Sequence, residues 1–300
     1  MNNIPKKIVQ FLLKWSAKIY LLRLKPHIIV IAGTTGRHWV KESVKEALLE
    51  RKLQVRTNKK NFNAEIGLPL SILNLISGEG SFWMWLAIIY YGFKKAVRAK
   101  PPIFKEFLVL EMAIDRPKNM KYLLSIAKPQ AVIITNITMV YQENFENLDG
   151  IALEYKKLVK SLPWNGLIVL NNDDERVKNL ANFAENKVIT YGFSDGTEFQ
   201  ASAVRKLVDG QEFKLKIANP SENRLIKINR FGNHHIYAAL IKEVVKENYR
   251  ISATDFFSGI REKEPKPKKS PQINLTKSDF VRQPPTSNES REPHETPPLF

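Results

Sequence analysis

The stretch HIIVIAGTTGRHWVKE, residues 27–42, decides the fold. Its apolar, largely β-branched beginning predicts a buried strand over residues 27–32. Gly33 and Gly36 then predict a tight turn, and a helix is expected over residues 39–51. A glycine-containing turn between a strand and a helix presents backbone N–H groups to phosphate at the positive end of the helix. The stretch therefore predicts a strand–turn–helix unit with a candidate phosphate-binding loop.

Further strands and helices alternate along the chain. Four apolar runs predict strands, namely FLVLEM (107–112), AVIIT (131–135), LIVL (167–170) and VITY (188–191). Helices are expected between them, over residues 118–127 and 176–184 among others. Apolar strands that alternate with helices are typical of a mostly parallel sheet covered on both faces. We therefore predict an α/β fold.

The pattern changes after residue 192 and again near residue 262. Short strands are predicted over 199–207, 212–217 and 224–228, as a small antiparallel section, followed by a helix over 235–247. Eight of the 17 prolines of the chain lie beyond residue 262, a composition typical of disorder. The predicted organisation is a basic helix over 1–26, a central domain over 27–261 and a disordered tail over 262–300.

Composition narrows the classes of function. The 300 residues contain 47 Lys and Arg against 30 Asp and Glu, a formal net charge of +17, and no cysteine. The lack of cysteine excludes disulfides, thiolate metal sites and cysteine nucleophiles. The positive charge favours an anionic partner such as a nucleotide, a nucleic acid or an acidic membrane surface. No nucleic-acid recognition motif is recognisable, so nucleic acid is the least favoured of the three.

Two apolar segments raise the question of a membrane. Residues 1–25 predict an amphipathic helix that either packs on its own domain or lies on anionic lipid. FWMWLAIIYYGF (82–93) is shorter than the roughly 20 residues that span a bilayer, so it predicts a buried or a second interfacial helix. The apolar side of the first helix comprises Ile4, Ile8, Phe11, Leu12, Trp15, Ile19 and Leu22, and Lys7, Gln10, Lys14, Lys18 and Lys25 fall on the other side.

Six segments in order resemble motifs of the Mur ligases. They are GTTGRHWVKE (33–42), NFNAEIGLPLSIL (61–73), VLEMAIDRP (109–117), ITNI (134–137), LPWNGLIVLNNDDERV (162–177) and FGNHHIYAAL (231–240). Their order and spacing agree over roughly residues 27–260 with the ATP-binding central domain of that family. The similarity is greatest to the members that join D-alanyl-D-alanine to UDP-MurNAc-tripeptide.

The resemblance implies a function and a set of site residues. Mur ligases form an amide bond at the expense of ATP in peptidoglycan precursor synthesis, with Mg²⁺ bridging phosphate oxygens. ATP and Mg²⁺ are therefore the expected cofactors, and UDP-MurNAc-peptide or cell-wall synthesis proteins the expected partners. The cytoplasm is the expected location, and the helix over residues 1–25 extends this expectation to peripheral contact with the inner face of the membrane. By the same resemblance, Glu111 is the metal ligand. The implied nucleotide-binding residues are Gly33, Thr34, Thr35, Gly36, Arg37, His38 and Asn171.

The chain departs from the family pattern at several positions. Arg37 replaces the loop lysine, His38 replaces the magnesium-binding threonine, and Trp39 replaces the next hydroxyl residue. Tyr141 and Tyr155 fall where the family has a metal-site histidine and a carbamylated lysine. The flanking domains that hold the UDP-sugar and the amine are also expected to be missing. We therefore predict weak or no independent ligase activity, a pseudoenzyme. A non-catalytic, membrane-associated scaffold or regulator of cell-wall synthesis is the alternative.

Overall fold

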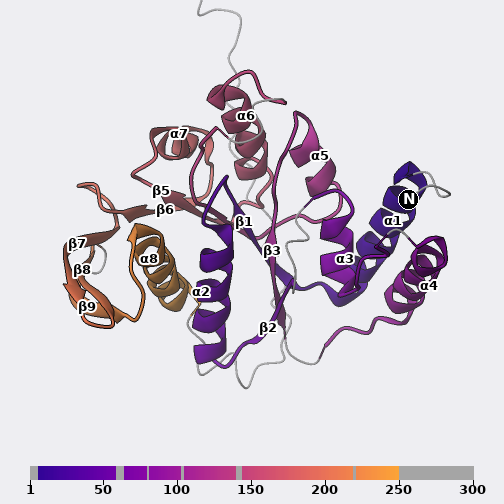
Figure 1. The fold of residues 1–300 in the computed structure, drawn as a ribbon, viewed down its shortest axis with the longest axis horizontal. Helices are drawn as coiled ribbons and strands as arrows, with labels where there is room; N and C mark the ends of the chain where they lie inside the picture. Colours follow the sequence, from indigo (N-terminus) through magenta and orange to yellow (C-terminus); the bar gives the residue numbers. More distant parts are fainter. Residues whose placement is uncertain are drawn as a thin grey trace, which may run out of the picture. The chain divides into compact units, whose positions relative to one another are not determined.

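The described strands form one sheet in the order β2-β3-β1-β4-β5-β6-β7-β8-β9 (Figure 1). The computed structural model describes residues 6–58, 64–79, 81–102, 105–139, 144–218 and 221–249. The predicted tail over 262–300 lies outside these residues. The strands are β1 (His27–Ala32), β2 (Gln54–Thr57), β3 (Glu106–Glu111), β4 (Ala131–Ile134), β5 (Leu167–Asn171), β6 (Lys187–Gly192), β7 (Phe199–Leu207), β8 (Gly210–Ile217) and β9 (Glu222–Ile228).

The described helices cover both faces of this sheet. They are α1 (Lys6–Leu24), α2 (Arg37–Glu50), α3 (Gly67–Leu73), α4 (Phe82–Arg98), α5 (Asn119–Leu124), α6 (Leu148–Val159), α7 (Glu175–Asn179), a 3₁₀ turn (Leu180–Phe183) and α8 (Asn233–Asn248). Pairing is parallel from β2 through β7, whereas β8 runs antiparallel to both β7 and β9. The predicted α/β fold with a small antiparallel section is confirmed.

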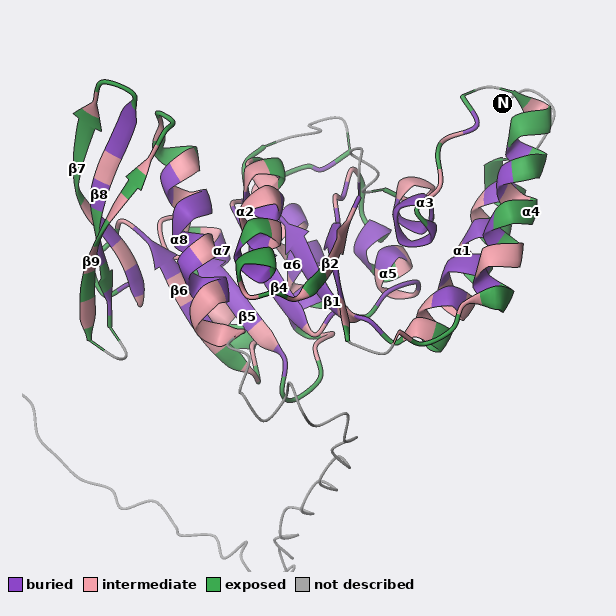
Figure 2. Cartoon of the chain, turned by 90° about the horizontal axis from the view of Figure 1, so that it is seen from below, coloured by how far each residue is buried: buried purple, intermediate pink, exposed green. Residues whose placement is uncertain are grey.

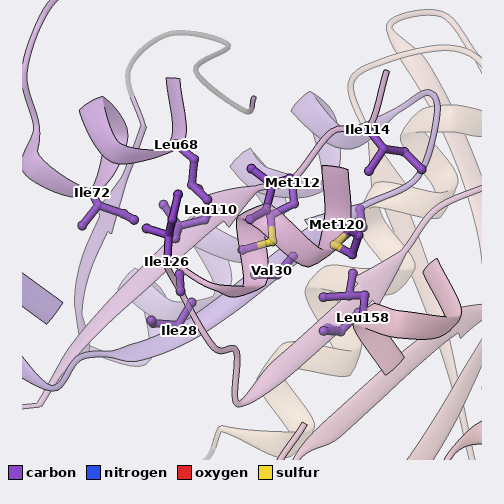
Figure 3. Packing of buried hydrophobic residues seen from close by; sticks show 14 of the residues in the cluster. Ile28, Val30, Leu68, Ile72, Leu110, Met112, Ile114, Met120, Ile126 and Leu158 are labelled. Atoms are coloured by element: carbon purple, nitrogen blue, oxygen red, sulfur yellow. The ribbon is translucent and has the colours of Figure 1, made fainter. Parts of the chain in front are cut away.

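Alternation along the strands divides the core into two layers. Ile28 and Val30 of β1 face the layer that contains α1, α3, α4, α5 and α6, part of which Figure 3 shows. Ile29 and Ile31 face the other layer, which α2 and α8 cover. Because side chains of successive residues in a strand point to opposite faces, a strand that is apolar throughout must be buried on both. The apolar runs therefore predicted not only the strands but also the sandwiching of the sheet between helices.

Several elements differ from their predicted bounds. The helix after the glycine turn begins at Arg37, two residues earlier than predicted, and α5 ends at Leu124 rather than at residue 127. The predicted helix over 176–184 is a short α-helix followed by a 3₁₀ turn. Elements β2 and α3 were not predicted, and α6 was expected only as a helix between two strands, without bounds.

Helix α1 packs through a different face from the one that its apolar pattern indicates. The buried apolar residues are Val9, Leu13, Ala17 and Tyr20, which recur at intervals of three and four, and Ser16 is buried beside them. Among the predicted apolar residues that the structure describes, all but Ile19 are exposed. These exposed residues are Ile8, Phe11, Leu12, Trp15 and Leu22. The helix therefore has two apolar flanks, and among the described residues only one of them is buried against the domain (Figure 2).

Helix α4 buries only a narrow strip of its apolar surface. Trp85, Ile88, Gly92 and Ala96 face inward, and Gly92 lets the helix approach closely because a β-carbon there would lie 3.3 Å from Leu73. The reading as a buried helix thus holds for one side of α4 only, and the interfacial reading stays a prediction. Within the described residues, no helix combines the length and the hydropathy needed to cross a membrane.

His27 gives the fold a pH dependence that can be measured. Burial, followed by the charge of Lys105, lowers the pKa of His27 to about 4. In the unfolded chain the pKa of this imidazole is near 6.5, so the unfolded state binds more protons below that pH. The free energy of unfolding therefore falls by roughly 3 kcal/mol as the pH drops from 6.5 to 4. We expect His27→Phe to remove this part of the pH dependence in urea unfolding at a series of pH values. Equal slopes for the two proteins would contradict the assignment.

Candidate functional site

The glycine turn after β1 lies against the end of β4. Gly33 has φ 122°, and a β-carbon at this position would lie 2.1 Å from the Thr135 hydroxyl oxygen. Gly36 has φ 78° and precedes the first turn of α2. Both conformations are ones that residues with side chains rarely adopt, which is why glycine stands at each. The turn expected from the sequence is present and joins a parallel strand to a helix.

Hydrogen bonds from the turn to Asn136 occupy two donors that face the loop interior. The Thr34 N–H donates to the Asn136 carbonyl oxygen, and the Thr35 N–H donates to Asn136 Oδ1, each at 2.9 Å. The Thr135 hydroxyl in turn donates to the Thr35 carbonyl oxygen at 2.7 Å. A phosphate at the turn must therefore rely on the N–H groups of the first turn of α2, which have no partners within the helix.

Arg37 turns back onto the loop. Its Nη1 donates to the carbonyl oxygens of Gly33 and Thr34, the latter at 2.9 Å. Its Nε is buried without a hydrogen bond and lies 3.8 Å from Glu111 Oε2. A guanidinium has several donors in a fixed plane and can satisfy two carbonyls of one turn. The side chain that replaces the family lysine therefore closes the loop rather than reaching out of it.

Glu111 is buried beside two cations. Lys41 Nζ lies 2.9 Å from Glu111 Oε1, and both side chains are 3% exposed. The Lys41 ammonium also donates to the Asn58 carbonyl oxygen at 3.5 Å. Among the described residues, no group of three or more His, Cys, Asp or Glu side chains could hold a metal ion. Glu111 is neutralised by Lys41 and Arg37, so the described residues around the turn do not fit a protein-bound Mg²⁺.

The segment after β5 is held by its own polar side chains. Asn171 Nδ2 donates to the Thr135 carbonyl oxygen at 2.8 Å, and Asn171 Oδ1 accepts from the Asp173 N–H at 3.0 Å. Asp174 caps α7 by accepting from the Val177 N–H at 3.0 Å. Burial acts to raise the pKa of Asp173, but hydrogen bonds from Ser194, the Phe193 N–H and Tyr237 outweigh it and leave the pKa lowered. Hydrogen bonds thus hold the turn that follows β5 on several sides.

A cavity of about 300 Å³ opens at the carboxyl ends of the parallel strands. Its lining includes Thr35 and Gly36 from the turn, Asn171 from β5, and His234 and Tyr237 from α8. The chain leaves β1 toward β2 on one side and continues from β3 to β4 on the other, so the sheet order switches between β1 and β4. Ligands of open α/β sheets bind at such a switch point. The cavity is therefore the candidate functional site.

Aromatic and basic side chains form the wall between α2 and α8. The Trp39 ring centroid lies 4.5 Å from that of His235, and the Arg230 guanidinium lies 4.7 Å above the Trp39 ring. Burial, then the charges of His234 and Arg230, lower the pKa of His235. This wall combines flat rings with a positive charge, which suits an aromatic anion.

The structure brings three of the eight predicted site residues to the cavity. Thr35, Gly36 and Asn171 line it. The other five, Gly33, Thr34, Arg37, His38 and Glu111, belong to the turn or its surroundings but do not line it. Tyr155 is a buried core residue, and Tyr141 lies outside the described residues.

Sequence reasoning missed several residues of the site. Asn136 and Tyr237 line the cavity, and Lys41 neutralises Glu111. Lys41 stands in the quoted loop segment GTTGRHWVKE, but its burial is not evident from a motif. Asn136 lies in the quoted segment ITNI, so position within that motif was the available signal.

The fold and the turn define an α/β domain with a glycine turn between its strand β1 and the helix that follows it. The sequence profile of the Mur ligase middle domain matches residues 91–242. The chain therefore belongs to the Mur ligase family through that domain.

Similar proteins support this assignment. The chain spans about half of the length of these proteins. The UDP-N-acetylmuramoyl-tripeptide–D-alanyl-D-alanine ligase of Bacillus subtilis is 25% identical over 244 residues, covering 81% of this chain and 46% of that protein. The crystal structure of a MurF ligase from Thermotoga maritima in complex with ADP has a TM-score of 0.64 at 19% identity, covering 84% of this chain and 52% of that one. A MurF structure from Acinetobacter baumannii has a TM-score of 0.62 at 16% identity, covering 82% and 47%.

The two turn glycines are expected to differ in their tolerance of a side chain. We expect Gly33→Ala to lower the free energy of unfolding by about 3 kcal/mol or more, because its β-carbon would overlap Thr135. Gly36→Ala meets no atom within 4 Å and should lose only about 1–2 kcal/mol from its left-handed backbone. Urea unfolding of both variants measures the difference, and equal losses would contradict the packing described.

Lys41 is expected to be needed chiefly because Glu111 is buried. Lys41→Met should lower the free energy of unfolding by about 3–5 kcal/mol, since it leaves an uncompensated buried carboxylate. The double variant Lys41→Met/Glu111→Gln should recover part of this loss. A double variant as unstable as Lys41→Met alone would show that packing, rather than charge, accounts for the effect.

Proposed function

We propose that the cavity binds an adenine nucleotide and that the chain acts in peptidoglycan precursor synthesis as a Mur-ligase-like domain with little or no ligase turnover of its own. The observation that carries the proposal is the position of Arg37. Its guanidinium is bound to the loop carbonyls and directed at Glu111, so it does not line the cavity. The turn keeps its shape, while the guanidinium of Arg37 binds groups of the protein itself.

Nucleotide binding is supported by the cavity wall. Trp39 and Tyr237 offer rings for a base, and the first turn of α2 offers N–H donors at the positive end of a helix. Arg230 and His234 add donors near the same wall. A nucleoside phosphate matches all three features, with the base between rings and the phosphate toward α2.

Weak turnover is supported by the polar and charged groups near the turn that already have partners within the protein. Amide formation driven by ATP develops negative charge on the transferring phosphoryl group, and one missing charge-stabilising contact commonly lowers the rate by about 100-fold or more. Here Thr34 and Thr35 N–H groups bond to Asn136, and Lys41 binds Glu111. A metal ligand role for Glu111 would first require Lys41 to leave, so we derive no step through Mg²⁺.

A second candidate function is a non-catalytic scaffold or regulator of cell-wall synthesis at the inner face of the membrane. The exposed apolar flank of α1 favours it, because such a flank needs a partner. UDP-MurNAc-peptide and cell-wall synthesis proteins remain the proposed partners in either case. The two candidates differ in whether nucleotide binds.

Calorimetry with Mg-ATP tests the proposed function. We expect the full chain to bind Mg-ATP in the micromolar to millimolar range, and Trp39→Ala to weaken binding by about tenfold through loss of a stacking ring. Trp164→Ala serves as the control, since Trp164 is exposed and does not line the cavity. The measured quantities are the dissociation constants of the three proteins.

Two results would contradict the proposal. The absence of binding heat at millimolar Mg-ATP would remove the nucleotide site. Phosphate release by the chain alone in the presence of Mg-ATP, UDP-MurNAc-tripeptide and D-alanyl-D-alanine, at the rate of a working ligase, would remove the pseudoenzyme assignment.

A further inference from the structure

The outward flank of α1 is apolar beside a basic edge. Phe11, Trp15 and Leu22 are 59%, 46% and 70% exposed. At 3.6 residues per turn these residues, with Ile8 and Leu12, fall within about 100° of one another on the helix surface. Lys14 and Lys18 occupy the adjoining edge, and Lys18 Nζ lies 4.7 Å from the centre of the Trp15 ring. The flank is thus an apolar stripe bordered by cations.

Helix α4 lies beside α1 and is apolar around most of its circumference. Trp83 is 77% exposed, and Tyr90 and Tyr91 are more than half exposed. The basic residues of α4 all lie within its last five residues and comprise Lys94, Lys95 and Arg98. A helix that is apolar on all sides is normally buried in protein or lipid. Here the side that faces away from α1 and α3 is left without cover among the described residues.

The charge of the two helices favours an anionic partner. Together they contain eight Lys or Arg residues, five in α1 and three in α4, and no Asp or Glu. A protein interface of this size would be expected to present both signs of charge, whereas the surface of an anionic bilayer is uniformly negative. Tryptophan and tyrosine next to lysine and arginine are the residues that lie at the boundary of lipid headgroups and acyl chains.

A basic groove marks where headgroups would sit. The carboxyl ends of α1 and α4 line a cavity of about 520 Å³ together with Tyr91, Lys94, Arg98 and Lys100. Arg23 at the end of α1 donates to the Ala99 carbonyl oxygen at 2.9 Å and so fixes the two helix ends together. The groove opens beside the apolar residues of α4, as a headgroup phosphate and its acyl chains would require.

We propose that α1 and α4 form a membrane-docking surface that lies in the headgroup region of an anionic bilayer. Trp15, Trp83 and Phe11 enter the boundary with the acyl chains, and the lysine and arginine residues bind lipid phosphate. This docking does not depend on nucleotide binding by the cavity, because the cavity is lined by other elements.

Vesicle binding by the full chain tests the proposal with a matched pair of variants. Trp83 and Trp164 are both 77% exposed, but only Trp83 lies on α4. We expect the chain to float with phosphatidylglycerol–phosphatidylcholine vesicles, Trp83→Glu to bind at least tenfold more weakly, and Trp164→Glu to bind like the unchanged chain. Phe11→Glu, on α1, should also weaken binding. Pure phosphatidylcholine vesicles and added salt should weaken binding as well, because the attraction is partly electrostatic.

Each alternative gives a different result. Thermal unfolding of all variants first verifies that the exposed substitutions leave the fold intact. If the chain ignores anionic vesicles, or if Trp83→Glu binds them as well as Trp164→Glu does, the proposal is overturned. If sedimentation shows a dimer that Trp83→Glu dissociates while vesicles remain unbound, the occupant is a second copy and the proposal is likewise overturned. Mg-ATP calorimetry on Trp83→Glu should match the unchanged chain, which separates this surface from the nucleotide site.

Discussion

The carboxyl edge of the sheet depends on the close contact between the Gly33 backbone and Thr135. No side chain fits between them, so β1 and β4 bring their ends together with the turn folded over β4. Thr135 and Asn136 then hydrogen-bond the turn, and Asn171 ties the end of β5 to the same point. Three strand ends are thereby fixed as one unit. The shape of the turn is consequently set by the protein itself, before any ligand is present.

The turn itself could be predicted from the sequence, but the roles of its side chains could not. Strand, glycines and helix follow from local sequence, and the motif order indicated the family. Whether Arg37 faces phosphate or its own carbonyls depends on Glu111, a residue on another strand. The burial of Lys41 likewise depends on β3 and on the loop at Asn58. Contacts between segments that are distant in the sequence decide these roles, and single-sequence patterns do not contain them.

The fold was predictable wherever burial covers both faces of a strand. The run HIIVIA can only be read as a buried strand. By contrast, β2, with the sequence QVRT, is short, polar and half-buried, and it becomes a strand through its pairing with β3. For helix α1 the apolar pattern predicted the helix but did not define which side of it packs. It has two apolar flanks, and hydrophobic periodicity alone does not tell which one packs. The flank with the larger predicted side chains is not the one that packs on the domain. The packed flank includes the small Ala17 and also Leu13, which lies close to Gly92 of α4.

The two candidate surfaces lie in different layers of the domain, which constrains how they work together. Helices α1 and α4 belong to the layer on one face of the sheet, and α2 and α8, which wall the cavity, cover the other. Docking through α1 and α4 therefore leaves the cavity wall away from the lipid and accessible to a soluble ligand. The same layering keeps the uniformly basic helices apart from the paired acids of α2 and α8, such as Glu50 with Lys246. The proposed nucleotide site and the proposed docking surface are therefore compatible with each other, because neither uses the surface of the other.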